Sequence, residues 1–578
     1  MELNTQKRLT SRMVELYEYQ AKVAAQIRGA IESGKNVCLE MPTGTGKTLT
    51  VLAALRGIKF SVFTRTLSQY SAWERDCISL GYRFSGLYGK ARVCKFLTKE
   101  PKDLRRKTRV SVRGKKWFAD GFPDLPLKRV GRPHEQLEET DLSPEEWESV
   151  ASELREAVRS SLAKCPECDF NKFDRRKPFP FIRSVYDYAK GEKDWCGYFA
   201  AREADTQVKL YSYPIFFLLR HLTKNKSVLV FDEAHNLEDA GDWARYVIDT
   251  DYLSRVHRLC GKEEWDSLNN LKVWRNRLSG SGIPDEPPSL VVTEGCPREE
   301  ELAKLSGLLK IIRTAPERFR YRITDKDVEI KCVDPSLPLE PLKSYRWIMM
   351  SGTMPSDWYL KKVLGLDDYV RVVSYPWSQK IRYFRHYSGS MKYELRTQEK
   401  EKIMKDVFAN FSADGELKLL VVPSYEIAEW FSGRYFIETP QMKISEVPLS
   451  GTVVGVMRGK IVEGVEFVDE AGRSRIKKVG IVAVPFGNSA DYFFRETLAT
   501  IAKKVGKGGE WSFMRERAIN AVSQVIGRGI RHRDDRLEVH LFDKRFSLIA
   551  DRLPSAVKGS DTARGIQSGD SKSFLHAS

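Results

Sequence analysis

The sequence lacks any apolar run long enough to span a bilayer, and it lacks an N-terminal charged-then-apolar signal. It also contains little cysteine, nine residues among 578. In a chain of this length that argues against a disulfide framework and makes metal ligation the more informative reading of any cysteine cluster. These absences disfavour integral membrane proteins and disulfide-stabilised secreted proteins. We therefore expect a soluble, intracellular protein.

An excess of acidic residues is also missing, because 96 Lys and Arg face 78 Asp and Glu, for a formal net charge of +18. With 42% hydrophobic residues the chain is globular rather than disordered, and its length suggests three or four domains with ample cores. This balance favours a polyanionic partner, with nucleic acid first and an acidic membrane surface second. Only residues 556–578, rich in Ser, Gly and Lys and without periodicity, are expected to be disordered.

Residues 36–48 are the most informative stretch, since a short apolar strand runs there into a glycine-rich turn and the start of a helix. The turn comprises Pro42, Thr43, Gly44, Thr45, Gly46, Lys47 and Thr48. Its glycines let the backbone approach phosphate oxygens, Lys47 supplies a positive charge and Thr48 offers a hydroxyl to Mg²⁺. Met41 replaces the glycine that usually leads this motif. The stretch predicts a phosphate cradle, and an ordinary strand-to-helix turn is the alternative.

Two further apolar strands end in residues that suit the same chemistry. Residues 227–231 lead into Asp232-Glu233-Ala234-His235, and residues 347–350 lead into Ser351-Gly352-Thr353-Met354. Asp232 could hold Mg²⁺, and Glu233 could orient and deprotonate an attacking water. An acidic pair at a strand end is common by itself, so the phosphate loop is what gives this pair a function. Small hydroxyl residues at the other tip could hydrogen-bond both the acidic strand end and a neighbouring nucleotide strand.

A second α/β unit is expected from about residue 374, with strands at 418–422, 452–457 and 479–484. Near its end, Gln524, Arg528 and Arg531 would share one face of a helix if residues 524–531 are helical. Two arginines on one face suit stabilisation of phosphoryl charge in a transition state, and equally suit a surface ion-pair network.

Several polar residues have both a functional and an ordinary interpretation. Thr64, Arg65 and Thr66 follow a second strand at 60–63, where they could hold a nucleic-acid backbone, although Arg65 could equally form a surface ion pair. Gln20 lies where many helicases keep a glutamine that reads adenine, but alone it reads as a solvated helix residue. A basic block within 102–116 and an acidic block within 135–148 are either solvated faces or a nucleic-acid contact.

Four cysteines form a constellation around these charge blocks. Cys165 and Cys168 make a C-x-x-C pair, with Cys94 before it and Cys196 after it. Four thiolates suit a cubane iron–sulfur cluster or zinc, so the spacing leaves the metal open. The remaining cysteines have no partner spacing and are interpreted as structural: Cys38, Cys77, Cys260, Cys296 and Cys332.

Taken together, these motifs resemble the XPD family of superfamily 2 DNA helicases, the iron–sulfur branch that includes DinG and FANCJ. The phosphate loop has that family's Met-Pro opening, and residues 232–235, 351–354 and 524–531 are similar to its later motifs. Residues 459–466 and 543–546 are similar to its fifth and closing motifs, and the order of the cysteines is similar too. One departure is the long gap between Cys94 and Cys165.

The resemblance implies an α/β fold of two RecA-like parallel-sheet motor domains, the first interrupted by an iron–sulfur cluster domain and a mainly helical arch domain. The implied boundaries are 1–93, 201–238 and 346–373 for the first motor, 94–200 for the cluster domain, 239–345 for the arch and 374–555 for the second motor. A 4Fe–4S cluster on Cys94, Cys165, Cys168 and Cys196 is implied rather than zinc.

The resemblance also implies which residues serve which role. ATP and Mg²⁺ would be bound and hydrolysed with the phosphate loop, Gln20, Asp232, Glu233, His235, Gly464, Glu466, Gln524, Arg528 and Arg531. DNA would be contacted by Thr64, Arg65, Thr66, Lys90, Tyr198 and Arg202. The partners would be single-stranded DNA and forked or tailed duplexes, met by a monomeric motor in the nucleoid-associated cytoplasm of a prokaryote.

The implied function is ATP-dependent 5′ to 3′ translocation on single-stranded DNA with duplex unwinding, in DNA repair. Two alternatives stay open. One is a DinG-like translocase or nuclease, which the sequence disfavours because it shows no separate nuclease domain. The other is a zinc-bound, non-catalytic nucleic-acid scaffold.

Overall fold

The computed structural model of the protein contains two compact units, each built on a parallel β-sheet. Unit 1 comprises residues 1–376 and 486–520, and unit 2 comprises 377–485 and 521–578. The structure describes residues 15–88, 107–112, 115–120, 128–129, 201, 205–213, 216, 228–239, 246–249, 263, 266–271, 273–274, 287–291, 299–323, 327–376, 380–465 and 467–554.

The sheet of unit 1 has seven strands, all parallel, in the order β13-β1-β12-β8-β2-β7-β3. They are β1 (Asn36–Glu40), β2 (Phe60–Thr64), β3 (Phe84–Gly86), β7 (Val208–Ser212), β8 (Val228–Asp232), β12 (Trp347–Ser351) and β13 (Tyr369–Val373). The strands β2, β8 and β12 are buried along their whole length. Their unbroken apolar sequences follow from this burial, because the strands of a parallel sheet are covered on both faces.

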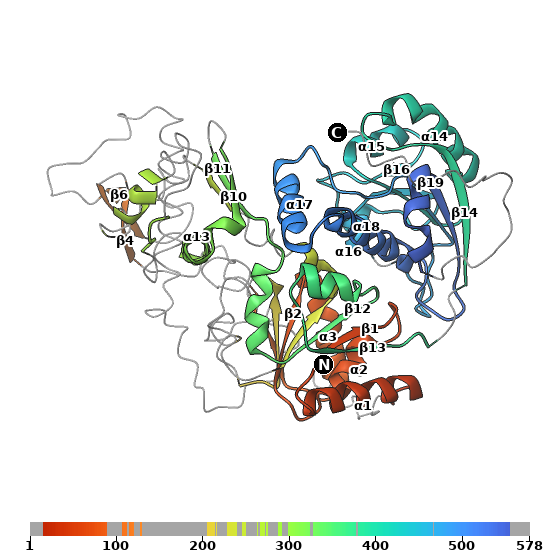
Figure 1. Ribbon diagram of the computed structural model, residues 1–578. Helices are drawn as coiled ribbons and strands as arrows, with labels where there is room; N and C mark the ends of the chain where they lie inside the picture. The colour runs from red at the N-terminus through yellow and green to blue at the C-terminus, as the bar shows by residue number, and fades with distance from the viewer. Residues whose placement is uncertain are drawn as a thin grey trace. The chain divides into compact units, whose positions relative to one another are not determined.

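Three helices supply side chains to the core around this sheet. They are α1 (Glu18–Glu32), α2 (Lys47–Ala54) and α3 (Tyr70–Ser79), drawn in red to orange in Figure 1. The buried positions of α1 include Val23, Ala24 and Ile27, which recur at helical spacing and pack the helix against its neighbours. The apolar face of α1 therefore contributes to the core of unit 1.

The segments inserted into unit 1 contain two small antiparallel sheets that the sequence did not predict. One has the order β10-β11-β9, from β9 (Tyr246–Asp249), β10 (Phe319–Ile323) and β11 (Asp327–Cys332), and lies in the segment expected to be mainly helical. Helix α13 (Glu299–Thr314) lies between β9 and β10 in the sequence. The other, of β4 (Lys107–Val112), β5 (Lys115–Asp120) and β6 (Lys128–Arg129), lies in the charged region.

Residues 486–520 belong to unit 1 although in sequence they lie between the two segments of unit 2. They contain α17 (Tyr492–Val505) and the first part of α18 (Gly509–Arg528). Ile501 and Phe513 enter the unit 1 core, and the Phe513 ring stacks on Tyr359 at a centroid distance of 5.7 Å. The expected second motor domain, 374–555, is thus not one contiguous compact unit, because the apolar side chains of residues 486–520 are buried in the core of unit 1.

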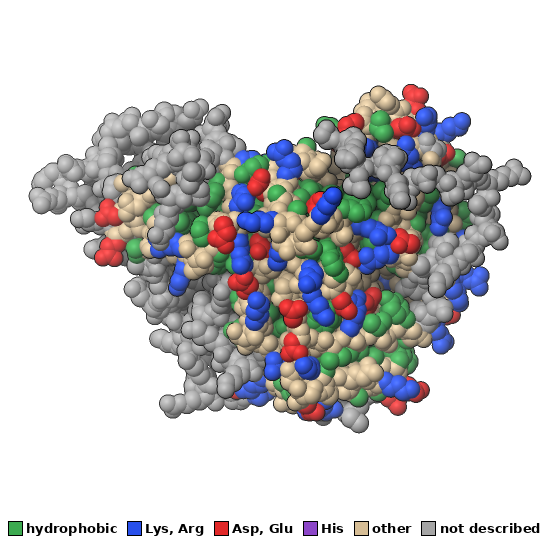
Figure 2. All heavy atoms as spheres, viewed as in Figure 1, with side chains coloured by type: hydrophobic (Ala, Val, Ile, Leu, Met, Phe, Trp, Pro, Cys, Tyr) green, Lys and Arg blue, Asp and Glu red, His purple; other side chains and the backbone are tan. Residues whose placement is uncertain are grey.

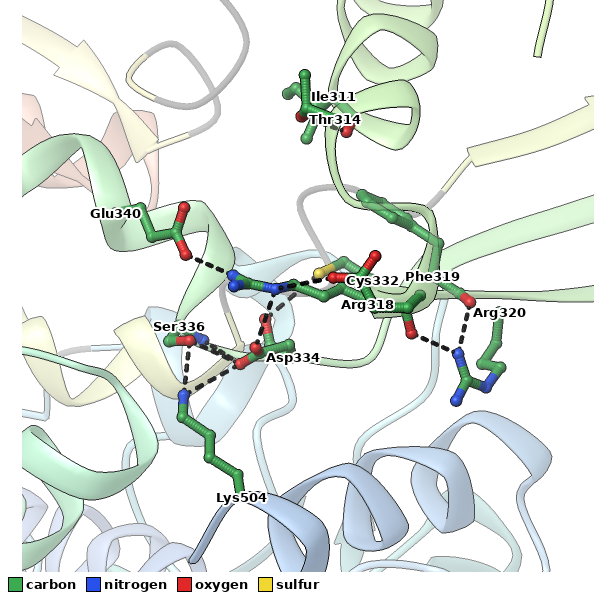
Figure 3. Close-up of polar contacts among 11 residues, drawn as sticks. Ile311, Thr314, Arg318, Phe319, Arg320, Cys332, Asp334, Ser336, Glu340 and Lys504 are labelled. Atoms are coloured by element: carbon green, nitrogen blue, oxygen red, sulfur yellow. Dashed lines mark hydrogen bonds and ion pairs between the residues drawn. The ribbon is translucent and has the colours of Figure 1, made fainter. Parts of the chain in front are cut away.

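Polar contacts join α17 to the residues that follow β11, as Figure 3 shows. Asp334 is buried, and its Oδ1 accepts hydrogen bonds from the Ser336 hydroxyl at 2.7 Å and from the Lys504 ammonium at 3.3 Å. Lys504 also donates to Ser336 Oγ at 2.6 Å, and the Arg318 guanidinium lies 3.6 Å from Asp334 Oδ2. A buried carboxylate is stable when it is paired and hydrogen-bonded in this way.

The sheet of unit 2 has six strands, also parallel, in the order β14-β19-β18-β15-β17-β16. They are β14 (Lys380–Gly389), β15 (Lys418–Val422), β16 (Phe436–Ile437), β17 (Thr452–Val456), β18 (Lys478–Ile481) and β19 (Arg536–Asp543). Helix α14 (Arg396–Asn410) and the short helices α15 (Tyr425–Ala428) and α16 (Lys460–Gly464) complete it. Ile403, Phe411 and Leu420 are fully buried members of its core.

Two parallel α/β units, as predicted, therefore form the framework of the protein. The predicted strand at 418–422 matches β15 residue for residue, and those at 452–457 and 479–484 overlap β17 and β18. Across the described part of the chain, no helix has the length and apolar character that crossing a membrane requires.

Candidate nucleotide-binding site

The strand order of unit 1 brings three of the predicted motifs to one edge of the sheet. β12 lies between β1 and β8, with Glu40 opposite Ser351 and Met350 opposite Asp232. Since all three strands are parallel, the loops after their carboxyl ends emerge side by side, which is where open α/β sheets bind ligands. The phosphate loop, the segment from Asp232 to His235 and the segment from Ser351 to Met354 therefore form one candidate site.

The phosphate loop has the backbone shape that an anion cradle needs. Gly44 and Gly46 adopt φ of 84° and 77°, in the left-handed region that glycine tolerates. A side chain at Gly46 is excluded by space as well, because its Cβ would lie 2.3 Å from Gln20 Nε2. The N–H groups of Gly46, Lys47 and Thr48 make no hydrogen bond to any residue that the structure describes. The start of α2 thus offers unused donors and a positive dipole end, which fit the phosphates of a nucleotide.

Two side chains of α1 support this loop from behind. Gln20 Nε2 and the Tyr19 hydroxyl both donate to the carbonyl oxygen of Thr45, at 2.9 and 3.1 Å. Gln20 is 4% exposed, and its Oε1 accepts from the N–H of Tyr17 at 2.9 Å. Its interpretation as a solvated helix residue is wrong, because the amide is used to hold the loop. A contact with adenine stays a prediction.

The Asp232 carboxylate is buried and accepts two hydrogen bonds. The Trp73 indole donates to its Oδ2 at 2.9 Å and the N–H of Glu233 donates to its Oδ1 at 2.9 Å. Burial raises the pKa of Asp232 to about 6, and the negative charge of Glu233 acts in the same direction, while the Trp73 hydrogen bond and the Lys47 cation oppose it. A divalent cation would favour the charged carboxylate here, so the residue fits the role of a Mg²⁺ ligand.

Trp73 is a site residue that sequence reasoning missed. It is fully buried in α3, and a buried indole N–H needs an acceptor. A large aromatic side chain with an N–H donor was the available signal, but nothing in the sequence pointed to Asp232 as its partner, 159 residues away.

The acidic loop is also tied to β12. His235 Nδ1 lies 2.9 Å from Ser351 Oγ and 3.3 Å from Glu233 Oε2. The same hydroxyl accepts the N–H of Thr353 at 3.1 Å. The expected link from Ser351 to the acidic strand end is therefore present, through His235. Glu233 itself adopts φ of 53°, an uncommon conformation for a residue with a side chain, which turns the chain sharply after β8.

The residues proposed to hold DNA at the end of β2 are engaged in local contacts. Thr64 is fully buried and its hydroxyl donates to the carbonyl of Thr66 at 2.9 Å. Arg65 Nη1 donates to Asn236 Oδ1 at 3.0 Å, so it connects the loop after β2 with the loop after β8. These contacts shape the loop, and the nucleic-acid role of the three residues stays a prediction.

The predicted residues of unit 2 lie around α16 and the end of α18. Gln524 and Arg528 are one turn apart on α18, but this helix ends at Arg528, so the predicted helix over 524–531 is too long and Arg531 does not extend the same face. The Arg528 guanidinium donates to the carbonyls of Glu463 at 2.8 Å and Val465 at 3.2 Å, on either side of Gly464. Glu466 lies outside the described residues.

Asp535 fixes the turn that follows α18 and was not predicted. Its buried carboxylate accepts the N–H groups of Arg531 at 2.7 Å, His532 at 2.8 Å and Ser474 at 3.2 Å. The helix therefore ends where this carboxylate draws the backbone away from helical geometry, which places Arg531 on a turn.

The proposed metal-binding and several DNA-binding residues fall outside the described part of the chain. They are Cys94, Cys165, Cys168, Cys196, Lys90, Tyr198 and Arg202. No group of three or more potential metal ligands occurs among the residues that are described. Cys38, Cys77 and Cys332 are buried and unpaired, as expected of structural cysteines, and burial raises the pKa of the Cys332 thiol to about 12.

On the face shown in Figure 2, Lys and Arg side chains are interspersed with Asp and Glu. The net positive charge is therefore not gathered into one patch on the described part of this face, and charge does not locate a nucleic-acid contact there.

Three family models match parts of the sequence. They are the helicase C-terminal domain at residues 372–559, the res subunit of type III restriction enzymes at 13–68 and DEAD_2 at 148–246. The first covers the unit 2 sheet, and the second covers the phosphate loop.

Known proteins extend this likeness to nearly the whole chain. The ATP-dependent DNA helicase XPD of Sulfolobus acidocaldarius is 24% identical over 593 aligned positions, which cover 92% of this chain and 97% of that protein. The ATP-dependent DNA helicase chl1 of Schizosaccharomyces pombe is 35% identical, but over 18% of this chain and 13% of its own length.

Solved structures show the same fold. The structure titled XPD_Helicase has a TM-score of 0.58 at 21% identity, over 93% of this chain and 97% of that one. Xpd4 of S. tokodaii has a TM-score of 0.50 at 17% identity, over 92% and 96%. With the helicase family models, these likenesses show that the chain is similar to XPD helicases over nearly its whole length and shares their fold.

Proposed function

We propose that this protein is an ATP-dependent DNA helicase, which couples ATP hydrolysis to movement along single-stranded DNA and to separation of a duplex. One observation carries the proposal: the phosphate loop, the acidic loop after β8 and Ser351 meet at a single edge of the unit 1 sheet. The XPD and chl1 relatives are both named ATP-dependent DNA helicases, and this similarity supplies the substrate class.

The chemistry assigned to unit 1 is phosphoryl transfer to water. Lys47 lies close enough to Asp232 to lower the pKa of that carboxyl. The Lys47 ammonium would therefore be near the metal site, where it would bind the outer phosphates. Thr48 and Asp232 would hold Mg²⁺, which neutralises charge on the phosphates when bound. Glu233, turned out of the strand direction at φ of 53°, would orient the attacking water and accept its proton, with His235 as its neighbour at 3.3 Å.

The assignments in unit 2 follow the resemblance. Gln524, Arg528 and Arg531 would stabilise the charge on the transferred phosphoryl group, and Gly464 and Glu466 would contact the nucleotide. Arg528 already anchors to two backbone carbonyls, which orients its guanidinium. An arginine in this role supplies a large part of the rate enhancement in phosphoryl transfer.

We further propose a 4Fe–4S cluster on Cys94, Cys165, Cys168 and Cys196, within a cluster domain at 94–200, and an arch domain at 239–345. DNA would be held by Thr64, Arg65, Thr66, Lys90, Tyr198 and Arg202 and moved in the 5′ to 3′ direction, with a role in repair by a monomeric, nucleoid-associated enzyme. Four thiolates at these spacings, in a chain with few other cysteines, support the cluster.

The experiment that tests this function measures ATP-dependent unwinding of duplexes that carry a single-stranded tail at either the 5′ or the 3′ end. The proposed helicase unwinds the 5′-tailed duplex and needs ATP and Mg²⁺. Its ATPase rises when single-stranded DNA is added, because strand binding and hydrolysis are coupled.

Three outcomes would contradict parts of this proposal. Preference for the 3′ tail would overturn the direction. Translocation or cleavage without strand separation would favour a DinG-like enzyme. A colourless protein with bound zinc and no DNA-stimulated ATPase would favour the scaffold, whereas broad visible absorption by the purified protein would support the iron–sulfur cluster.

A further inference from the structure

The turn between β17 and α16 has an unusual backbone. It runs through Met457, Arg458 and Gly459, and Gly459 N–H donates to the carbonyl of Val456 at 2.7 Å. Arg458 adopts φ of 63°, which residues with side chains rarely do outside functional or tightly determined sites. Something in the surrounding structure must therefore hold this turn.

A buried carboxylate supplies that hold. Glu438 follows β16 and is 1% exposed, and its two oxygens accept the N–H groups of Val456 at 2.9 Å, Ile461 at 3.3 Å and Lys460. The Tyr425 hydroxyl adds a fourth contact at 3.4 Å. Two of the donors that the start of α16 would otherwise expose, the N–H groups of Lys460 and Ile461, are satisfied by this one side chain, and its negative charge lies at the positive end of the helix.

The sequence of the turn fits this carboxylate closely. A Cβ on Gly459 would lie 2.3 Å from Glu438 Oε1, so only glycine leaves room for it. Gly459 has φ of −83° and ψ of 179°, which any residue adopts, so the reason for glycine here is space rather than conformation. The ammonium of Lys460 turns away from the helix start and donates to the carbonyls of Pro440 and Met442.

The opposite end of α16 is held by Arg528. Its guanidinium donates to the carbonyls of Glu463 at 2.8 Å and Val465 at 3.2 Å, where the helix runs out of internal partners. Helix α16 is thus clamped between a buried anion at its start and a cation at its end, in the order that its dipole favours. Any shift of the helix start is transmitted over five residues to the carbonyls that orient Arg528.

From these contacts we propose that Glu438 is a positioning residue for ATP hydrolysis, which fixes α16 and through it the guanidinium of Arg528. This inference rests on the function proposed above, in which Arg528 stabilises phosphoryl charge. It also gives α16 a role different from that of α2: the start of α16 does not bind phosphate, because Glu438 already occupies its donors.

The test compares Glu438→Gln with Glu429→Gln, an exposed glutamate of the same unit. The amide of the first variant brings N–H donors toward three backbone N–H groups, so the clamp opens while the side-chain volume is kept. We expect kcat for ATP hydrolysis to fall about tenfold or more, because an arginine in this role is worth far more than that. KM for ATP should change less than kcat, since the phosphate loop lies in unit 1 and α16 contributes only Gly464 to the proposed nucleotide contacts. Glu429→Gln should match the parent protein.

A second variant separates positioning from mere stability. In an Arg528→Lys background, Glu438→Gln should cause almost no additional loss of kcat, because the group on which it acts is already absent. A purely structural role would instead lower the fraction of protein that binds ADP and would add to the Arg528→Lys loss. That result, or an unchanged kcat in Glu438→Gln, would overturn the proposal.

Hydrogen exchange gives a readout that does not depend on activity. The N–H groups of Val456, Lys460 and Ile461 should be protected in the parent protein and exchange faster in Glu438→Gln, but not in Glu429→Gln. Unchanged protection would overturn the clamp itself. If the parent protein hydrolyses no ATP, the function proposed above fails, and the exchange experiment still decides whether Glu438 holds α16.

Discussion

Two strand–turn–helix units in this protein look alike in sequence and differ in what their helix starts can bind. Each has a buried strand, a turn with glycine and then a lysine at the first helical position, Lys47 in α2 and Lys460 in α16. The donors at the start of α2 meet no described partner, whereas those at the start of α16 are met by Glu438. Only the first can receive the phosphates of a nucleotide.

The glycines of the two turns also serve different purposes. Gly46 needs its left-handed φ of 77°, while Gly459 has ordinary extended dihedrals and provides room for a carboxylate. In the second turn the left-handed position falls on Arg458 instead. A Gly-Lys pair after a buried strand is therefore not sufficient evidence for a phosphate site, and the decisive observation is whether the helix N-terminus is already occupied.

The largest expected difference between the two turns comes from replacing their lysines. Lys47→Ala should abolish ATP hydrolysis and unwinding while any visible absorption from the proposed cluster persists, because Lys47 is the proposed cation of the cradle. Lys460→Ala should retain ATP binding, since among the described residues the Lys460 ammonium donates only to the backbone carbonyls of Pro440 and Met442. Steady-state ATPase and ADP titration of both variants measure this. Equal loss of nucleotide affinity in the two would remove the distinction.

Replacing the glycines should separate conformation from space. Gly46→Ala combines a left-handed φ with a contact of 2.3 Å to Gln20 Nε2, so nucleotide affinity should fall about tenfold or more. Gly459→Ala has no conformational penalty and should instead displace the Glu438 carboxylate, lowering kcat at nearly constant affinity. ADP affinity and kcat measured for each variant check this. A loss of affinity in Gly459→Ala would contradict the comparison.

A smaller effect is expected from the indole that supports the open site. Trp73→Phe keeps the core filled but removes a hydrogen bond that lowers the pKa of Asp232, so this pKa should rise by about one unit. In the proposed role Asp232 must be charged to hold Mg²⁺. The pH below which ATPase activity is lost should therefore move upward in Trp73→Phe. The pH dependence of kcat/KM measures the shift, and Trp358→Phe in the same unit is the control. An unmoved acidic limb would remove Trp73 from the site.

The elements that were predictable from sequence are those with a local signal. Strands β2, β8, β12 and β15 are short apolar runs because they are buried, and the phosphate loop is a contiguous motif. By contrast, β19 mixes charged and apolar residues, since its first residue is exposed and the rest is mostly buried, and it was not predicted. The local sequence pattern therefore identifies buried central strands better than it identifies strands that contain charged residues.

The residues that sequence reasoning missed act across large separations. Trp73 reaches Asp232, and Glu438 reaches a turn about twenty residues later, so neither pairing leaves a pattern in the chain. The end of α18 was misplaced because Asp535 draws the N–H groups of Arg531 and His532 out of helical geometry. The Trp73 and Glu438 contacts are tertiary hydrogen bonds to buried carboxylates, which no local propensity encodes, whereas the Asp535 contacts to Arg531 and His532 span only four and three residues and are a local signal that was overlooked.

The smallest expected effect concerns residues 486–520, which come from the unit 2 part of the sequence and pack in unit 1. Lys504→Met should remove the ammonium from Asp334 and Ser336 (Figure 3) and weaken the docking of α17 by about 1 kcal/mol, since the lysine is partly exposed. Amide hydrogens of residues 492–505 should then exchange about fivefold faster. Lys503→Met, an exposed neighbour on the same turn, should leave exchange unchanged. If both variants behave alike, apolar contacts such as the stacking of Phe513 on Tyr359, rather than the Lys504 contacts, hold this segment in unit 1.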